Sequence, residues 1–198
     1  MKERPYILGL TGSIGMGKST TADFLRDAGI PVWGADASVH QLYQKDGAGV
    51  RAIRALAPAA IKDGAVDRSA LRQAILDDSG LLQRIEAKVH PLVTADRREF
   101  LEKHSDQSLL VCDIPLLFET GADKWLDGVL VVTTDSEIQK QRVMAREGMT
   151  LKVFETILDK QTPDAEKQAK ADYVIDTGMG LDHARSEVLS LIEQLKGK

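Results

Sequence analysis

The feature that most constrains this chain is a glycine-rich octapeptide close to its beginning. Residues 12–19 read Gly-Ser-Ile-Gly-Met-Gly-Lys-Ser, which matches the G-x-x-x-x-G-K-[ST] spacing of a phosphate-binding P-loop. An apolar run at Tyr6–Thr11 precedes the octapeptide and a helical pattern at Lys18–Ala28 follows it. A chance glycine-rich turn would lack this strand–loop–helix context. We therefore expect an α/β protein with the P-loop NTPase fold.

The residue types of the octapeptide each suit one part of phosphate binding. Glycines let the backbone curl so that successive N–H groups point inward, and the following helix adds the positive end of its dipole. Lys18 can bridge the β- and γ-phosphates of ATP, while the Ser19 hydroxyl can ligate Mg²⁺. The expected nucleotide-binding residues are Gly12, Ser13, Ile14, Gly15, Met16, Gly17, Lys18, Ser19 and Thr20.

Short apolar runs alternate with helical patterns along the rest of the chain, which is typical of a parallel sheet covered by helices. The expected strands are Tyr6–Thr11, Ile30–Trp33, Leu109–Cys112, Val129–Thr133 and Tyr173–Ile175. The last helix is expected at Leu181–Leu195, where apolar residues form one stripe. The pattern predicts a five-stranded parallel sheet.

Two stretches exceed what a simple crossover between strands needs. The first lies between the second and third strands and is mainly helical; within it, Asp67 is a candidate N-cap for a helix at Arg68–Leu76. The second, Ser136–Gln161, makes two helices interrupted at residues 148–150, a hinge suited to a lid. We expect one domain over 1–198, with a core of 1–36, 105–135 and 171–198, a helical acceptor-binding excursion over 37–104 and a helical lid over 136–165.

Two aspartates follow apolar strands, where ligands bind in parallel sheets. Asp113 ends the third strand and is a candidate Mg²⁺ ligand, or alternatively a helix or turn cap. Asp36 follows the second strand and is a candidate general base for an acceptor hydroxyl. Spacing alone supports an N-cap role for Asp36 equally well, and the two roles are compatible.

Arg142 and Arg146 are four positions apart on the expected lid helix, with Gln139 beside them. Their guanidiniums could neutralise charge on a transferred phosphoryl group, but a solvated helix face is an equally good interpretation. The same solvated interpretation applies to Lys152, Lys160, Lys167 and Lys170. The dipeptide His90-Pro91 interrupts a helical stripe, so we expect a break or kink there.

The bulk composition narrows the class of protein. A formal net charge of −4 gives no general basic footprint, so we expect no extended nucleic-acid binding. The one cysteine, Cys112, lies in an apolar run and is expected to be a core residue of a cytoplasmic protein. No stretch approaches the length of a membrane span, and no Cys/His cluster has metal-ligand spacing. Mg²⁺ brought with ATP is the only metal we expect.

Several of these segments together resemble the dephospho-coenzyme A kinase family from Ile7 to about Leu195. The P-loop is shared with many families, whereas the run Asp-Ile-Pro-Leu-Leu-Phe-Glu at 113–119 is much more restricted. The other matching pieces are Ala35-Asp36, the segment 66–71, His90-Pro91-Leu92 and the segment 171–176.

The resemblance implies ATP-dependent phosphorylation of the ribose 3′-hydroxyl of dephospho-coenzyme A, the last step of coenzyme A biosynthesis. It implies that Asp36 is the base and that Arg142 and Arg146, with Gln139, close over the phosphates. It also implies an acceptor site shaped by Asp67, Arg68, His90, Pro115, Leu116, Leu117 and Phe118. A cytoplasmic enzyme that is a monomer or weak homo-oligomer fits these features.

The chain departs from the family pattern at three places: Gly34 replaces an aspartate before Ala35-Asp36, Ile157 stands where many members have arginine, and Thr177 replaces asparagine. Two other classes of protein share parts of the pattern. Kinases for nucleoside monophosphates or shikimate have the P-loop and lid, but should lack the run at 113–119. A GTP-driven switch usually has an Asn-Lys-x-Asp segment, and none occurs here.

Overall fold

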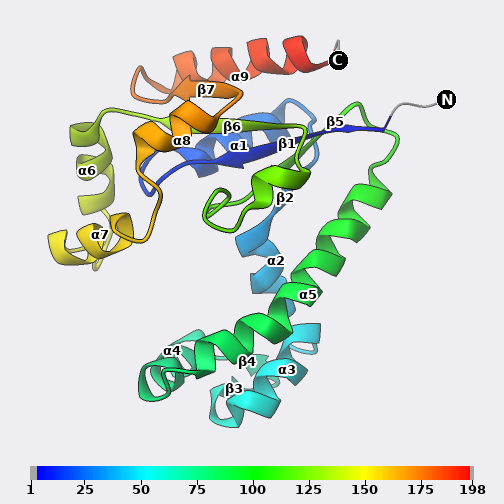
Figure 1. The fold of residues 1–198 in the computed structure, drawn as a ribbon, viewed down its shortest axis with the longest axis vertical. Coiled ribbons are helices and arrows are strands. Elements are labelled where there is room, and N and C mark those ends of the chain that lie inside the picture. The colour runs from blue at the N-terminus through cyan, green and yellow to red at the C-terminus, as the bar shows by residue number, and fades with distance from the viewer. Residues whose placement is uncertain (1–3, 197–198) are drawn as a thin grey trace. The chain divides into compact units, whose positions relative to one another are not determined.

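A computed structural model describes residues 4–196, which divide into two compact units (Figure 1). The first unit takes the chain up to Val32 and again from His104 onward, and the second is Trp33–Lys103. The second unit covers most of the expected acceptor-binding excursion but begins four residues earlier, at Trp33 instead of residue 37. In the described part of the chain, no helix has both the length and the apolar character that crossing a membrane requires.

The first unit is built on the predicted sheet. The strand order of this sheet is β2-β5-β1-β6-β7, and β1, β5, β6 and β7 lie wholly in the first unit. Their bounds are β1 Tyr6–Thr11, β2 Val32–Gly34, β5 Leu109–Asp113, β6 Gly128–Thr133 and β7 Tyr173–Asp176. Strand β1 pairs in parallel with both β5 and β6, and β6 pairs in parallel with β7. The P-loop strand β1 is therefore central, which brings the ends of β5 and β6 to either side of it.

The central strands are apolar because they are buried on both faces. Every residue of Leu109–Cys112 and of Gly128–Val132 is buried, as expected for the middle of a parallel sheet. Strand β2 starts two residues later than predicted. Pro31 carries no N–H and so cannot donate to a ladder, although its carbonyl accepts a bond from the Val111 N–H at 3.0 Å.

The helices of the first unit are α1 Lys18–Asp27, α6 Ser136–Met144, α7 Leu151–Leu158, α8 Asp164–Lys170 and α9 Leu181–Leu195, with a short 3₁₀ helix η2 at Ala122–Trp125. Helices α1 and α9 pack against each other and share one core with the sheet. That core includes Leu8, Leu10, Leu25, Leu130, Val188 and Ile192. The α9 stripe predicted from the sequence is buried as expected.

The predicted interruption of the second helical stretch is confirmed. Helix α6 ends at Met144 and α7 begins at Leu151. Between them Gly148 has φ +73°, a backbone conformation that favours glycine. The Thr150 hydroxyl then caps α7 by accepting a bond from the Val153 N–H at 3.3 Å.

The second unit is helical apart from one small hairpin. Its elements are α2 Ala35–Leu42, α3 Ala48–Leu56, η1 Pro58–Ala60, β3 Ile61–Lys62, β4 Ala65–Val66, α4 Arg68–Asp77 and α5 Leu81–Lys103. The unpredicted hairpin turns at Asp63-Gly64, both with positive φ, as a two-residue turn requires. The unit has a core of its own formed by Val50, Ile53, Leu71, Leu81, Ile85 and Val89.

Of the expected break or kink at His90-Pro91, the break is wrong, because α5 runs through it without interruption. The kink stays a prediction. Proline removes the N–H that would bond the carbonyl of Ala87, one turn earlier. Ala87, His90 and Pro91 are all exposed, so water can satisfy that carbonyl, while Leu81, Ile85 and Val89 anchor the opposite face in the core. The carbonyl that loses its helical hydrogen bond therefore lies on the exposed face of α5.

Replacement of this proline tests that explanation. We expect Pro91→Ala to raise the free energy of unfolding by about 2 kcal/mol, since proline is about 3 kcal/mol less favourable than alanine inside a helix and restricts the unfolded chain in partial compensation. Urea unfolding monitored by circular dichroism measures the change. Thr94→Ala, at an exposed position one turn later, is the matched control and should gain much less. An unchanged or less stable Pro91→Ala variant would contradict the explanation.

Candidate active site

The P-loop connects the end of β1 to the start of α1 and adopts the conformation that its glycines predict. Gly15 has φ +81° and Gly17 has φ +88°, values that L side chains rarely adopt. A Cβ atom on Gly17 would also lie 2.9 Å from the Thr177 hydroxyl oxygen. Gly17 is the N-cap of α1, so the first N–H groups of that helix point toward the loop and form an anion site.

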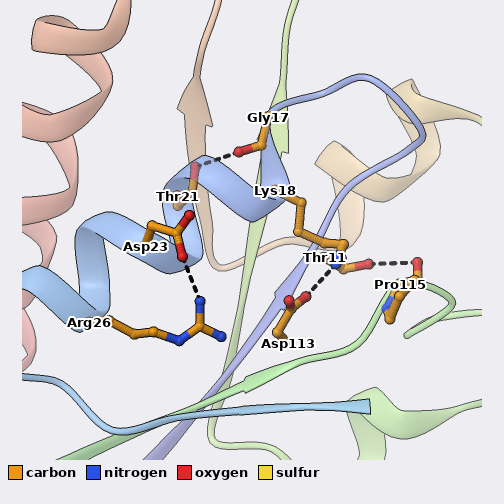
Figure 2. A network of polar contacts seen from close by, with 8 residues as sticks. All are labelled: Thr11, Gly17, Lys18, Thr21, Asp23, Arg26, Asp113 and Pro115. Atoms are coloured by element: carbon orange, nitrogen blue, oxygen red, sulfur yellow. Dashed lines mark hydrogen bonds and ion pairs between the residues drawn. The ribbon is translucent and has the colours of Figure 1, made fainter. Parts of the chain in front are cut away.

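Lys18 and Asp113, both predicted site residues, are brought together by the sheet (Figure 2). The Lys18 ammonium donates to a carboxylate oxygen of Asp113 at 2.5 Å, and each side chain is 16% exposed. Lys18 follows the loop after β1, and Asp113 is the last residue of the neighbouring strand β5. On the same edge, the Thr11 hydroxyl donates to the Pro115 carbonyl at 3.1 Å. A cation and an anion therefore face each other beside the loop.

The residues at this edge also suit a magnesium ion. Ser19 adjoins Lys18 in the first turn of α1, and its residue is exposed. A hydroxyl and a carboxylate are hard oxygen ligands, the kind that Mg²⁺ prefers alongside phosphate oxygens. Among residues 4–196 no group of three or more His, Cys, Asp or Glu could hold a metal by itself. A site with few protein ligands fits an ion that arrives bound to a nucleotide.

Three consecutive carbonyls of the P-loop accept bonds from side chains behind it. The amide of Gln139 donates to Ile14 at 2.8 Å, and the Arg142 guanidinium reaches the Gly15 carbonyl at 3.5 Å. The Thr177 hydroxyl contacts the Met16 carbonyl at 3.0 Å. Gln139 and Thr177 are buried, and Arg142 is partly buried. These side chains fix the outward face of the loop.

Arg142 bonds mainly to the segment after β7. Its two terminal nitrogens donate to the Thr177 hydroxyl and to the Thr177 carbonyl, both at 2.8 Å. Sequence reasoning treated Thr177 only as a variant of a turn, so its role was missed. The one available signal was its position directly after β7, where a residue reaches the ligand edge of the sheet.

Arg146 does not share the surroundings of Arg142. Helix α6 ends at Met144 with Ala145 as its C-cap, so Arg146 lies beyond the helix and the predicted common helix face is wrong. The Arg146 residue is exposed. Gln161, from the opposite end of the two-helix segment, accepts a bond from the Ile14 N–H at 3.1 Å. Both ends of the segment thus meet the P-loop at Ile14.

The side chains of the run at 113–119 differ in their exposure to solvent. Leu116 is 40% exposed, and Pro115 and Phe118 are partly buried. Leu117 is fully buried and points toward Gly9, where an added Cβ would lie 2.7 Å from it. The expectation that Leu117 lines the acceptor site is therefore corrected, because its side chain belongs to the core.

The remaining predicted residues belong to the second unit. Asp36 is exposed in the first turn of α2, and the N-cap is Gly34, so the capping alternative for Asp36 is wrong. The Asp67 side chain caps α4 as predicted, accepting from the Ala70 N–H at 2.9 Å, and also pairs with Lys62. The hydrogen bond from Lys62 and those from the α4 backbone hold the pKa of Asp67 below its ordinary value.

Two further predicted residues of this unit lie at its surface. Arg68 is exposed at the first position of α4. Its charge opposes the rise in the pKa of Tyr43 that burial causes. His90 is exposed on α5 and lines a shallow hollow of about 450 Å³, whose other residues are Ala87, Pro91, Thr94, Ala95 and Arg98.

Comparison with known proteins extends the match beyond the P-loop. Residues 6–182 match the family model described as dephospho-CoA kinase. The chain belongs to the dephospho-CoA kinase family. A dephospho-CoA kinase of Jannaschia sp. is 55% identical over 190 residues, covering 96% of this chain and 97% of the relative. One from Mesorhizobium japonicum is 50% identical, covering 97% and 98%.

Solved structures agree with this family. The structure of TT1252 from Thermus thermophilus has a TM-score of 0.82 at 34% identity, covering 97% of this chain and 98% of that one. A dephospho-CoA kinase from Campylobacter jejuni has a TM-score of 0.70 at 21% identity over 98% and 99%, and so shows the fold alone. A shikimate kinase from Acinetobacter baumannii, at 18% identity and a TM-score of 0.51 over 96% and 93%, shares no more than that fold. The predicted P-loop kinase fold is confirmed.

The contacts behind the P-loop generate a prediction for ATP affinity. We expect Thr177→Val to weaken ATP binding about tenfold, because the change removes the hydroxyl that contacts one guanidinium nitrogen of Arg142 and the Met16 carbonyl. A loss of about 1.4 kcal/mol corresponds to tenfold. Isothermal titration with ATP measures this. Thr177→Ser keeps the hydroxyl and is the matched control, expected to bind within about threefold of the original. Equal binding by the Val and original proteins would contradict a role for the hydroxyl.

Proposed function

We propose that this chain transfers the γ-phosphoryl group of ATP to the ribose 3′-hydroxyl of dephospho-CoA, giving CoA and ADP. The observation that carries the proposal is the intact P-loop, with Lys18 held against Asp113, in a chain that matches dephospho-CoA kinases over nearly its whole length. Phosphoryl transfer needs positioning and charge neutralisation more than covalent chemistry. The residues of the site divide those tasks.

The P-loop binds the phosphate chain of ATP. Gly15, Gly17 and the first turn of α1 present N–H groups to the phosphates, and Lys18 binds the β- and γ-phosphate oxygens. Lys18 is already aimed along the strand edge by its ion pair with Asp113, so little reorganisation is needed when ATP arrives. Preorganisation of this kind lowers the barrier because charge develops in surroundings that are already oriented.

Ser19 and Asp113 would hold a magnesium ion, directly or through water. The ion, when bound, would neutralise charge on the β- and γ-phosphate oxygens.

Asp36 accepts the proton of the 3′-hydroxyl as the phosphoryl group moves. Its exposed carboxylate in the first turn of α2 directly follows β2, a strand of the same sheet as β1. Further acceptor contacts that we propose, as the family resemblance implies, are Asp67, Arg68, His90, Pro115, Leu116 and Phe118.

The two lid arginines contribute differently. Arg142 holds the P-loop through its bonds to Gly15 and Thr177. Its effect on phosphoryl transfer therefore comes from the position that the loop gives to the bound phosphates. We expect Arg146, which is exposed beyond the end of α6, to bind the transferred phosphoryl group when the segment closes. A guanidinium suits this task because it offers several N–H donors in a fixed plane.

We expect the protein to work in the cytoplasm, as a monomer or weak homo-oligomer and without a nucleic-acid partner. Its formal charge of −4 agrees with the expectation of no nucleic-acid partner. Its substrate, dephospho-CoA, is a small soluble molecule, so no macromolecular partner is required for the reaction.

Product analysis tests the proposed function. ADP release should require ATP, Mg²⁺ and dephospho-CoA together, and mass spectrometry with fragmentation should place the new phosphate on the ribose 3′ oxygen. AMP, shikimate and a reaction without acceptor are the controls and should release little ADP. Comparable ADP release with AMP or shikimate would reject dephospho-CoA as the acceptor while keeping the P-loop assignment.

The same assay tests the proposed base. Asp36→Asn should lower turnover by about 10²–10⁴-fold, the usual contribution of a general base, with ATP affinity unchanged. Lys18→Ala should lower turnover as well but also weaken ATP binding, because Lys18 contacts the phosphates themselves. An Asp36→Asn enzyme with near-normal turnover would remove Asp36 from the mechanism.

A further inference from the structure

Lys167 is a buried charge that phosphoryl transfer, as described above, does not use. Its side chain on α8 is fully buried, although the sequence pattern suggested a solvated lysine. The Nζ atom lies 3.3 Å from Oε1 of Glu119, and it makes no hydrogen bond with the described residues. An ammonium out of contact with water is costly unless an acid compensates it. Glu119 is that acid, so the two residues must be understood together.

Glu119 ends the run at 113–119 and links it to the segment that returns from the lid. Its side chain is 17% exposed, and the same Oε1 atom accepts a bond from the Thr162 N–H at 2.7 Å. Burial raises the pKa of the Glu119 carboxyl, but the Thr162 N–H, its own N–H and the Lys167 ammonium together lower the pKa below its ordinary value. Glu119 therefore stays charged at neutral pH and binds two points of this segment at once.

Gln161, the residue before Thr162, bonds to the P-loop. Its amide oxygen accepts the Ile14 N–H of the P-loop at 3.1 Å. Two adjacent residues thus bond to different parts of the first unit. Thr162 bonds to Glu119 of the run at 113–119, called the acceptor-side run below, and Gln161 bonds to the P-loop. A displacement of Thr162 would also displace Gln161 and alter its bond with the Ile14 N–H, since the two residues are adjacent.

Neighbouring contacts hold the same segment in place. The Thr133 hydroxyl at the end of β6 donates to Asp164 at 2.6 Å. The Lys170 ammonium lies 5.8 Å from the ring centre of Phe118. The segment from Gln161 to Lys170 therefore contacts the rest of the first unit at several points, and Lys167 is fully buried in one of these contacts.

We propose that Glu119 and Lys167 are positioning residues: they hold the Gln161–Thr162 segment so that Gln161 fixes the P-loop at Ile14, tying the acceptor-side run to the nucleotide-binding loop. The link to the acceptor rests on the function proposed above. The effect on ATP binding depends on the P-loop alone. Removing the Lys167 charge leaves Glu119 free to turn toward water, releasing Thr162 and, with it, Gln161.

ATP affinity in the absence of acceptor is the decisive readout, measured by isothermal titration with ATP and Mg²⁺. We expect Lys167→Met and Gln161→Ala each to weaken ATP binding about fivefold to tenfold, the effect of one hydrogen bond. If Lys167 acts through Gln161, the Lys167→Met/Gln161→Ala double variant should bind no more weakly than Gln161→Ala alone. Lys152→Met, at an exposed lysine of α7, is the matched control and should bind normally.

Other outcomes would overturn the inference. Normal ATP affinity in a folded Lys167→Met protein would show that the ion pair contributes to stability but does not position the P-loop. Effects that multiply in the double variant would show that Lys167 and Gln161 act independently. Because no acceptor is present, either outcome is separate from a failure to phosphorylate dephospho-CoA.

A neutral version of the pair covers the case in which Lys167→Met does not fold. Glu119→Gln/Lys167→Met removes both charges, and the new amide oxygen can still accept the Thr162 N–H. We expect this double variant to fold and to bind ATP within about threefold of the original protein, since the Thr162 bond is kept. A folded double variant that binds as weakly as Gln161→Ala would contradict the proposed route through Thr162.

Discussion

The rest of the site depends on the orientation of a few peptide groups in the P-loop. A loop that turns its N–H groups inward to phosphates must turn its carbonyls outward, and buried carbonyls need partners. Ile14, Gly15 and Met16 find them in Gln139, Arg142 and Thr177. Two of these partners come from α6 and one from the residue after β7. The nucleotide site is therefore shaped from behind by segments far away in the sequence.

Two cations of the first unit make contacts of this supporting kind. The Arg142 guanidinium is bonded to Thr177 and to the loop, and the Lys167 ammonium is buried against Glu119. The guanidinium holds backbone directly, whereas the ammonium contacts the Glu119 carboxylate, which in turn accepts the Thr162 N–H. Such support is what phosphoryl transfer needs, because most of its catalysis comes from preorganised positioning.

The sequence predicts what local patterns encode. The P-loop, its flanking strand and helix, the α9 stripe and the Asp67 cap depend on neighbours within a few residues, and each was found where expected. Thr177, Gln161 and Lys167 were missed because their partners lie more than forty residues away in the sequence. The break at Pro91 was overpredicted, since a local rule cannot tell that the lost bond faces water. Leu117 was misplaced because an apolar run does not say which side chain turns inward.

The most direct test of the account is the ATP affinity of a Gln139→Leu protein, measured by isothermal titration beside its affinity for dephospho-CoA. Leucine keeps the buried volume of Gln139 but removes the donor to the Ile14 carbonyl. If the outward carbonyls set the shape of the loop, ATP binding should weaken about tenfold while dephospho-CoA binding stays unchanged. Unchanged ATP affinity in a stably folded Gln139→Leu protein would contradict the claim that side chains behind the P-loop shape the nucleotide site.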